Sequence, residues 1–112
     1  MSRGSLYAKV LVDVPGLGPL DYLVPDDMLV ATGDRVVVNL QTRKVVGIVV
    51  AMQTATDLQG KRIRSILRVL NDVPPLSAEW LSLTRFAALY YMRGWGEAAL
   101  SALPTFFKRL PK

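Results

Sequence analysis

Apolar and polar residues alternate along the first half of the chain in the pattern of short β-strands. From Leu6 to Val12, apolar residues recur at every second position, which is the period of a strand with one buried face. Three later segments have a similar apolar character and are separated by prolines, glycines or polar turns. These segments are residues 20–24 (LDYLV), 35–40 (RVVVNL) and 45–53 (VVGIVVAMQ). We therefore predict four strands within the first 53 residues.

The third and fourth of these segments are predicted to pair as a hairpin, because only the polar sequence QTRK (41–44) lies between them. Gly47, inside the fourth segment, indicates a bulge or a bend where a sheet wall must curve. Residues 63–70 (IRSILRVL) alternate again and predict a last strand, with a short helix as the alternative.

The pattern changes after residue 72, where Pro74 and Pro75 close the strand region. Ser77 is a candidate N-cap for a helix. Apolar residues at positions 80, 83, 87 and 90 then form a helical stripe. Residues 97–104 (EAALSALP) predict a second, shorter helix that Pro104 ends.

The predicted fold class is α+β. It consists of a small antiparallel, barrel-like β unit of the size of an OB or SH3 domain, followed by two C-terminal helices. We expect a β-rich subdomain over residues 1–72 and a helical subdomain over residues 73–112.

The composition excludes several kinds of chemistry. The 112 residues include no cysteine and no histidine, which rules out disulfides, thiolate zinc sites and Ser-His-Asp triads. No phosphate-binding loop motif occurs. Charges interrupt every apolar run before the roughly 18 residues of a membrane span, and the N-terminus lacks a signal-peptide core. We therefore expect a cytoplasmic binding domain with no catalytic residue, no metal site and no membrane partner.

The charge is concentrated in the middle of the chain. The net charge is +5, and residues 35–68 carry seven of the fourteen basic residues against the single acid Asp57. This excess of positive charge in one third of the chain favours a partner that bears phosphates, such as a nucleic acid. A solvated surface that keeps the protein soluble is the alternative.

The motifs, taken in order, resemble the N-terminal domain of the PriA family of primosomal replication-restart helicases. The family's Asp-Tyr motif is matched by LDYLVP (20–25), and its G-x-R-V-x-V motif is matched by GDRVVV (33–38). Its lysine-bearing later strand is matched by RSILRVLND (64–72). Its final motif is matched by Tyr90-Tyr91 and GEAALSALP (96–104). The resemblance covers almost the whole chain.

The resemblance implies that this domain captures the 3′ end of the nascent leading strand at a stalled replication fork. In the family the binding pocket uses an aspartate beside an aromatic residue, a glycine after the third strand and a lysine from the later strand. Asp21 matches the aspartate, and Arg64 stands at the lysine position. The pocket implied for this chain consists of Leu20, Asp21, Tyr22, Leu40, Gln41 and Arg64.

Asp21 is the residue of this set with the most specific chemistry. A free 3′ terminus has a hydroxyl where a continuing strand has a phosphate ester. A carboxylate accepts a hydrogen bond from the hydroxyl and repels the phosphate. The alternative is that Asp21 only caps a turn. Tyr22 is the candidate for stacking on a base, and the remaining basic side chains would contact phosphates. These phosphate contacts are Arg43, Lys44, Lys61 and Arg62.

The resemblance also implies that the chain is the N-terminal part of an ATP-dependent 3′–5′ DNA helicase. The motor, its ATP and a zinc site would lie in downstream domains, so this segment is expected to be no enzyme and to need no cofactor. The expected partners are forked DNA with a leading-strand 3′ end, the downstream helicase domains, primosome proteins and single-stranded DNA-binding protein, at the nucleoid. Two alternatives are an SH3-like or ribosomal-type barrel that binds RNA, and a protein-docking module that uses the apolar helices.

Overall fold

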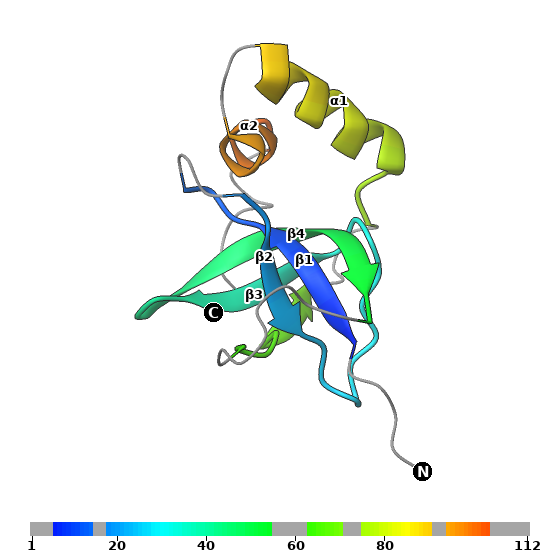
Figure 1. The fold of residues 1–112 in the computed structure, drawn as a ribbon, viewed down its shortest axis with the longest axis vertical. Helices are drawn as coiled ribbons and strands as arrows, with labels where there is room; N and C mark the ends of the chain where they lie inside the picture. Colours follow the sequence, from blue (N-terminus) through cyan, green and yellow to red (C-terminus); the bar gives the residue numbers. More distant parts are fainter. Residues whose placement is uncertain (1–5, 15–17, 55–62, 71–74, 91–93, 104–112) are drawn as a thin grey trace.

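The computed structural model describes residues 6–14, 18–54, 63–70, 75–90 and 94–103. Strands form the first part of the chain and two helices follow them (Figure 1). This arrangement confirms the predicted α+β class. The elements are β1 (Tyr7–Leu11), β2 (Leu20–Leu23), β3 (Arg35–Leu40), β4 (Arg43–Gln53), β5 (Arg68–Leu70), α1 (Ala78–Tyr90) and α2 (Trp95–Ser101).

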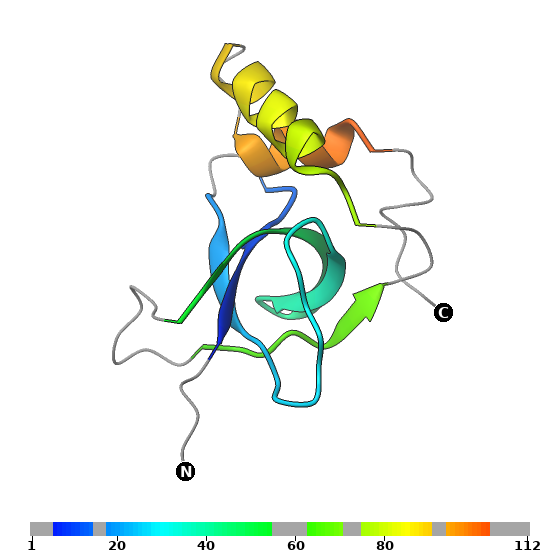
Figure 2. The same ribbon diagram turned by 90° about the vertical axis from the view of Figure 1, so that its right-hand side faces the viewer.

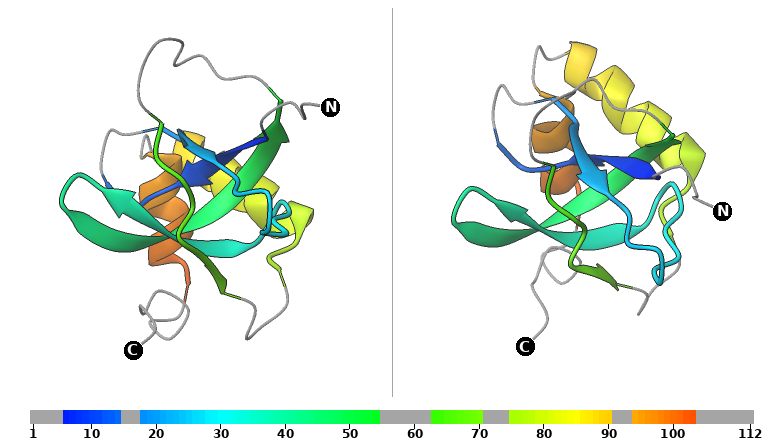
Figure 3. Two further views of the ribbon diagram at one scale, coloured as in Figure 1. Left: turned by 90° about the horizontal axis from the view of Figure 1, so that it is seen from below. Right: turned by 60° about the horizontal axis from the view of Figure 1, so that its bottom comes forward.

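The strands form one curled antiparallel sheet with the order β2-β1-β4-β3-β5. The sheet is open, but the main chain of residues 63–67 runs between its two edges (Figures 2 and 3). The N–H of Ile66 donates to the carbonyl of Leu23 in β2, and the N–H of Leu67 donates to the carbonyl of Val37 in β3, both at 2.9 Å. The β unit therefore resembles a barrel without a continuous strand ladder around it.

The expectation of one strand over residues 63–70 is wrong in extent. Only β5 pairs as a strand, and Ser65 forms an isolated parallel bridge with Leu23. The reason is geometric: residues 63–67 bond first to β2, at one edge of the sheet, and then to β3, next to the other edge, so they cannot continue along a single neighbour.

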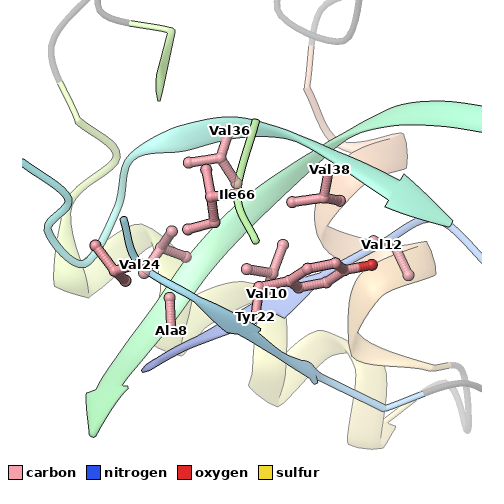
Figure 4. Close-up of a cluster of buried hydrophobic side chains, with 9 residues drawn as sticks. Ala8, Val10, Val12, Tyr22, Val24, Val36, Val38 and Ile66 are labelled. Atoms are coloured by element: carbon pink, nitrogen blue, oxygen red, sulfur yellow. The ribbon is translucent and has the colours of Figure 1, made fainter. Parts of the chain in front are cut away.

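The first core lies inside the curl of the sheet and consists mainly of valines. In β1 the inward positions are those predicted from the alternation, and β2, β3, β4 and residue 66 contribute the rest (Figure 4). The β-branched side chains suit this site because they pack well on a pleated surface. The buried residues are Ala8, Val10, Val12, Tyr22, Val24, Val36, Val38, Val49 and Ile66.

The second core joins the outer face of β1 and β4 to the two helices (Figure 1). The predicted N-cap is confirmed, because the Ser77 hydroxyl accepts the N–H of Trp80 at 3.0 Å. The predicted stripe on α1 is displaced by one position: the buried residues are Leu81, Thr84 and Ala88. Two of these side chains, Thr84 and Ala88, are small, whereas the larger Leu83, Phe86 and Leu89 are exposed.

Two glycines, Gly47 and Gly96, stand where the chain packs closely. A Cβ on Gly47 would lie 2.7 Å from the carbonyl oxygen of Leu11. The bulge or bend predicted at Gly47 lies three residues later, at Val50. There the β1–β4 register shifts between Lys9 and Val10, and Val50 has no partner in β1. The curl of the sheet is thus produced by a bulge opposite the middle of β1.

α2 begins at Trp95, two residues before the predicted start, and includes Gly96 in its first turn. A Cβ on Gly96 would collide with the main-chain carbonyl of Val12. The helix therefore rests directly on the chain that leaves β1. In the described part of the chain, no helix combines the length and apolar character that would let it cross a bilayer.

Candidate nucleic-acid interface

A pocket of about 280 Å³ lies beside the edge strand β2, at the end of β3 and next to the segment that links the sheet edges. All six residues of the pocket implied by the sequence line it, although they come from three separate parts of the chain. Two more lining residues, Asn39 and Ile63, were not anticipated. The lining residues are Leu20, Asp21, Tyr22, Asn39, Leu40, Gln41, Ile63 and Arg64.

Tyr22 forms the inner side of this pocket. Its ring belongs to the first core, where it lies alongside Val10 and points toward Val12 (Figure 4). Its hydroxyl donates to the main-chain carbonyl of Asn39 at 2.7 Å. Burial raises the pKa of Tyr22 above the ordinary value of 10.0, and the positive charge of Arg64 partly offsets this rise. The ring is thus fixed in the core, which leaves little of its face for stacking on a base.

Arg64 and Gln41 close the opposite side of the pocket. Nη1 of Arg64 donates to the main-chain carbonyl of Gln41 at 2.6 Å, which holds the guanidinium against the β3–β4 turn. Gln41 has φ +57°, in the left-handed region that glycine adopts without strain. The motif resemblance places the family's glycine near this position. The guanidinium has five N–H donors, and the bond to the turn uses one of them.

Asp21 makes an ion pair that the sequence analysis missed. Nζ of Lys9 lies 3.0 Å from Oδ1 of Asp21, and the two residues are directly opposite each other on β1 and β2. The Asp21 side chain is 4% exposed and that of Lys9 is 32% exposed. A strand register that pairs these positions is the only signal that could have indicated the contact, and it depends on how the two strands align.

The predicted phosphate contacts fall into two groups. Arg43 and Lys44 are exposed at the start of β4, next to the two-residue turn of the β3–β4 hairpin. This hairpin extends to one side of the sheet (Figure 3). Lys61 and Arg62 lie outside the described residues.

Comparison with known proteins identifies the family of the chain. Residues 9–104 match the family described as the 3′DNA-binding domain (3′BD) of PriA. The chain is 36% identical over 97 residues to the replication restart protein PriA of Rickettsia typhi, over 87% of this chain and 15% of the relative. It is also 36% identical over 99 residues to PriA of Haemophilus influenzae, over 86% of this chain and 13% of the relative.

A third relative is PriA of Bacillus subtilis, which is 36% identical over 83 residues, 70% of this chain and 10% of the relative. The chain thus spans only 10 to 15% of the length of these three proteins. The match over residues 9–104 and the level of identity confirm the resemblance found in the motifs. The chain belongs to the family of PriA 3′ DNA-binding domains.

Proposed function

We propose that this chain binds DNA in replication restart and that its pocket receives the 3′-hydroxyl end of a strand. Family membership supports the DNA-binding part of the proposal. The observation that carries the finer part is that all six residues implied by the motifs line a single pocket. Residues far apart in the sequence would not converge in this way if the alignment of the motifs were accidental.

Asp21 is the residue proposed to recognise the terminal hydroxyl. A carboxylate has about four lone-pair positions, so it can accept a hydroxyl while it remains paired with Lys9. A strand that continued past this point would bring a phosphate to the same place. Because the side chain of Asp21 is almost fully buried, water screens that repulsion poorly. One acid would therefore favour a strand end and disfavour the interior of a strand.

Arg64 is the residue proposed to hold the terminal nucleotide by its phosphate. It lines the pocket, and its guanidinium is oriented by the bond to the Gln41 carbonyl. A planar guanidinium can present two parallel N–H groups to a phosphate, which an ammonium cannot do. In this proposal the β-rich part, expected over residues 1–72, carries the DNA site, and helices α1 and α2 support β1 and β4 from the opposite face.

The experiment compares strands that end in a 3′-hydroxyl with strands that end in a 3′-phosphate. We expect the wild-type chain to bind the hydroxyl form at least about tenfold more tightly, as for a charge-assisted hydrogen bond. Asp21→Asn keeps the shape of the side chain and should remove most of this preference. Asp26→Asn, which removes an exposed charge outside the pocket, should leave it unchanged.

Equal discrimination by wild type and Asp21→Asn would refute the proposed role of Asp21. Thermal unfolding of both variants shows whether a change in binding reflects folding. An RNA-binding barrel would instead prefer RNA of the same sequence or be indifferent to the strand end, so matched RNA strands belong in the same series.

A second role is favoured by an exposed apolar face on α1. Leu83, Phe86 and Leu89 lie at successive spacings of three residues and are 66%, 66% and 74% exposed. Three side chains cover less than the roughly 800 Å² per partner of a stable interface. A smaller contact suffices inside one chain, where tethering raises the effective concentration. Because the relatives are much longer, we propose that other domains of a PriA protein cover this face.

This second role has its own test. Hydrogen exchange of α1 would be slower in a protein of the relatives' length than in the present chain. Phe86→Ser should remove that difference and leave DNA binding by the present chain unchanged. Equal exchange rates in the two proteins would exclude the contact.

A further inference from the structure

The β3–β4 hairpin has two faces, and the strand register assigns its side chains to them. Val38 belongs to the first core, inside the curl of the sheet, and its partner Val45 packs against the same core. Directly opposite residues of an antiparallel pair lie on one face, and successive residues of a strand alternate between faces. The next pair toward the turn, Asn39 and Lys44, therefore lies on the outer face of the hairpin.

The inner face of the hairpin adjoins the pocket beside β2. The last pair before the turn, Leu40 and Arg43, lies on this face, and Leu40 lines the pocket. The Cβ atoms of directly opposite residues are about 4.5–5.5 Å apart, so Arg43 stands next to the wall of the pocket. A strand whose 3′ end occupies the pocket is therefore within reach of Arg43.

The outer face of the hairpin continues onto β5 and carries Arg68. Arg68 pairs with Val37, which lies two residues from Asn39 on β3 and so shares its face. The residue after Arg68, Val69, packs against the first core, which agrees with an outward Arg68. Lys44 and Arg68 are thus two strands apart and offset by two residues. The usual strand spacing and rise put their Cα atoms about 12 Å apart.

Lys44 and Arg68 are available for a partner outside the chain. Both side chains are exposed. Within the described ranges, neither of them is engaged in an ion pair or a hydrogen bond. Arg64 differs, because it is held by the carbonyl of Gln41. Strands β3, β4 and β5 contain no acidic residue, so the face carries positive charge only. Such a face suits a polyanion.

We propose that this outer face binds the phosphates of a second DNA strand, the complement of the strand whose 3′ end lies in the pocket. The inference rests on the proposed 3′-end site. Each strand of a duplex carries one phosphate per about 3.4 Å of helix axis, so two cations about 12 Å apart face a stretch of three or four phosphates. The Cα atoms of Arg64 and Arg68 are at most about 15 Å apart, because four chain steps separate them. One base-paired end can therefore reach both the pocket and the outer face, with the hairpin between its two strands.

The test uses one DNA strand with a 3′-hydroxyl, either alone or annealed to a longer complement. The complement leaves the last two nucleotides unpaired, so both DNAs offer the same end to the pocket. The measured quantity is the slope of log affinity against log salt concentration. Combining Lys44→Gln with Arg68→Gln should reduce the slope for the paired DNA by about 1.8, which is about 0.9 for each lost phosphate contact. The slope for the single strand should stay unchanged.

Two further variants serve as comparisons. Arg43→Gln, on the inner face, should reduce the slope for both DNAs by about 0.7–0.9. Arg85→Gln removes the same charge from the exposed surface of α1 and should leave both slopes unchanged. The single variants Lys44→Gln and Arg68→Gln should each give about half of the combined effect. Because both side chains are exposed, thermal melting should show that these variants fold like the wild type.

Equal losses for the paired and the unpaired DNA would overturn the inference. So would a combined variant that binds both DNAs as Arg85→Gln does, which is the result expected if the outer face binds an acidic protein segment. The same DNAs with a 3′-phosphate separate this inference from the proposed function. A wild-type chain without a 3′-hydroxyl preference refutes the end site, whereas the difference between paired and unpaired DNA still decides whether the outer face binds the complement.

Discussion

Lys9 and Asp21 face each other across β1 and β2, with Nζ of Lys9 3.0 Å from Oδ1 of Asp21. The pair is asymmetric, because the carboxylate is 4% exposed and the lysine is 32% exposed. A lysine that loses its partner can turn its ammonium group to water, whereas a buried carboxylate cannot. The buried acid therefore depends on this pair more than the lysine does, and the pair holds the acid beside the pocket.

This asymmetry predicts a double-mutant result. Lys9→Met keeps the aliphatic stem but removes the cation, and should lower the free energy of unfolding by about 1.5–2 kcal/mol because Asp21 loses a charge-assisted bond. Adding Asp21→Asn should restore part of that loss. Urea denaturation measures both variants, with Lys44→Met, on the exposed hairpin, expected to change stability by less than about 0.5 kcal/mol. A double variant less stable than Lys9→Met alone would contradict the argument.

Tyr22 predicts a loss of stability in alkali. Its pKa is raised in the folded state by burial, although Arg64 lowers it in part. The unfolded chain therefore releases this proton at lower pH than the folded chain does. Proton linkage then gives the direction of the effect. The contribution of Tyr22 to the free energy of unfolding is complete below pH 10, and it is lost as the pH rises from 10 through the folded-state pKa.

Tyr22→Phe separates this effect from other alkaline titrations. At pH 7 the variant should be less stable by about 1 kcal/mol, because the bond to the Asn39 carbonyl is lost. Above pH 10 its stability should fall less steeply than that of the wild type. Denaturant unfolding at a series of pH values provides the measurement, and Tyr7→Phe is the control on β1. Parallel curves for wild type and Tyr22→Phe would show that Tyr22 does not titrate in this way.

The backbone conformation of Gln41 predicts that position 41 accepts glycine more readily than other residues. Its φ of +57° is unfavourable for side chains with a Cβ and most unfavourable for β-branched ones. Gln41→Gly should raise the free energy of unfolding by between zero and about 1 kcal/mol. The relief of backbone strain in the folded state is partly offset by the greater entropy of the unfolded chain. Gln41→Val should destabilise by at least about 1 kcal/mol.

The DNA site should survive the glycine variant, because Arg64 bonds to the main-chain carbonyl of residue 41 and not to its side chain. Thr42→Gly is the control at the adjacent turn position, where we expect a loss of about 0.5–1 kcal/mol. The stabilities are compared by thermal melting. If the glycine and valine variants at residue 41 melt together, the backbone of the turn does not require the left-handed conformation.

Much of the fold follows from local patterns in the sequence. The parts that local patterns did not predict depend on contacts between residues that are distant in the sequence. Alternation located β1, short apolar segments between turns located β2 to β4, and Ser77 located the start of α1, because each signal lies within a few neighbouring residues. The face of α1 was misassigned because the large side chains lie one position away from the small buried ones, Thr84 and Ala88. A periodicity of 3.6 residues fits both stripes, and only packing against α2 decides between them.

The candidate site was predicted from ordered motifs and not from chemistry visible in the pattern. No local signal brings residue 64 beside residues 20–22 and 39–41, since this depends on the segment that links the sheet edges. The pairing of Lys9 with Asp21 was missed for a related reason. Strand register is set by the hydrophobic faces and turn geometry of the whole sheet, so a single carboxylate does not identify its partner.

Gly96 predicts a substitution effect opposite to that expected from helix propensity. Alanine in place of glycine inside a helix normally stabilises by about 1 kcal/mol. Here the added Cβ would collide with the carbonyl of Val12, so Gly96→Ala should instead destabilise by at least about 2 kcal/mol, by displacing α2 from the sheet. Gly18→Ala is the matched control, because a Cβ at Gly18 meets nothing within 4 Å.

The same substitution tests how the helices support the DNA site. The 3′-hydroxyl preference depends on β2 and residue 64, and not on the chain that leaves β1, so it should be retained in Gly96→Ala. Melting curves, and binding to strands that end in a 3′-hydroxyl or a 3′-phosphate, measure the two effects. A Gly96→Ala chain as stable as wild type would mean that α2 does not rest on the end of β1, and the helices would then have no structural part in recognition.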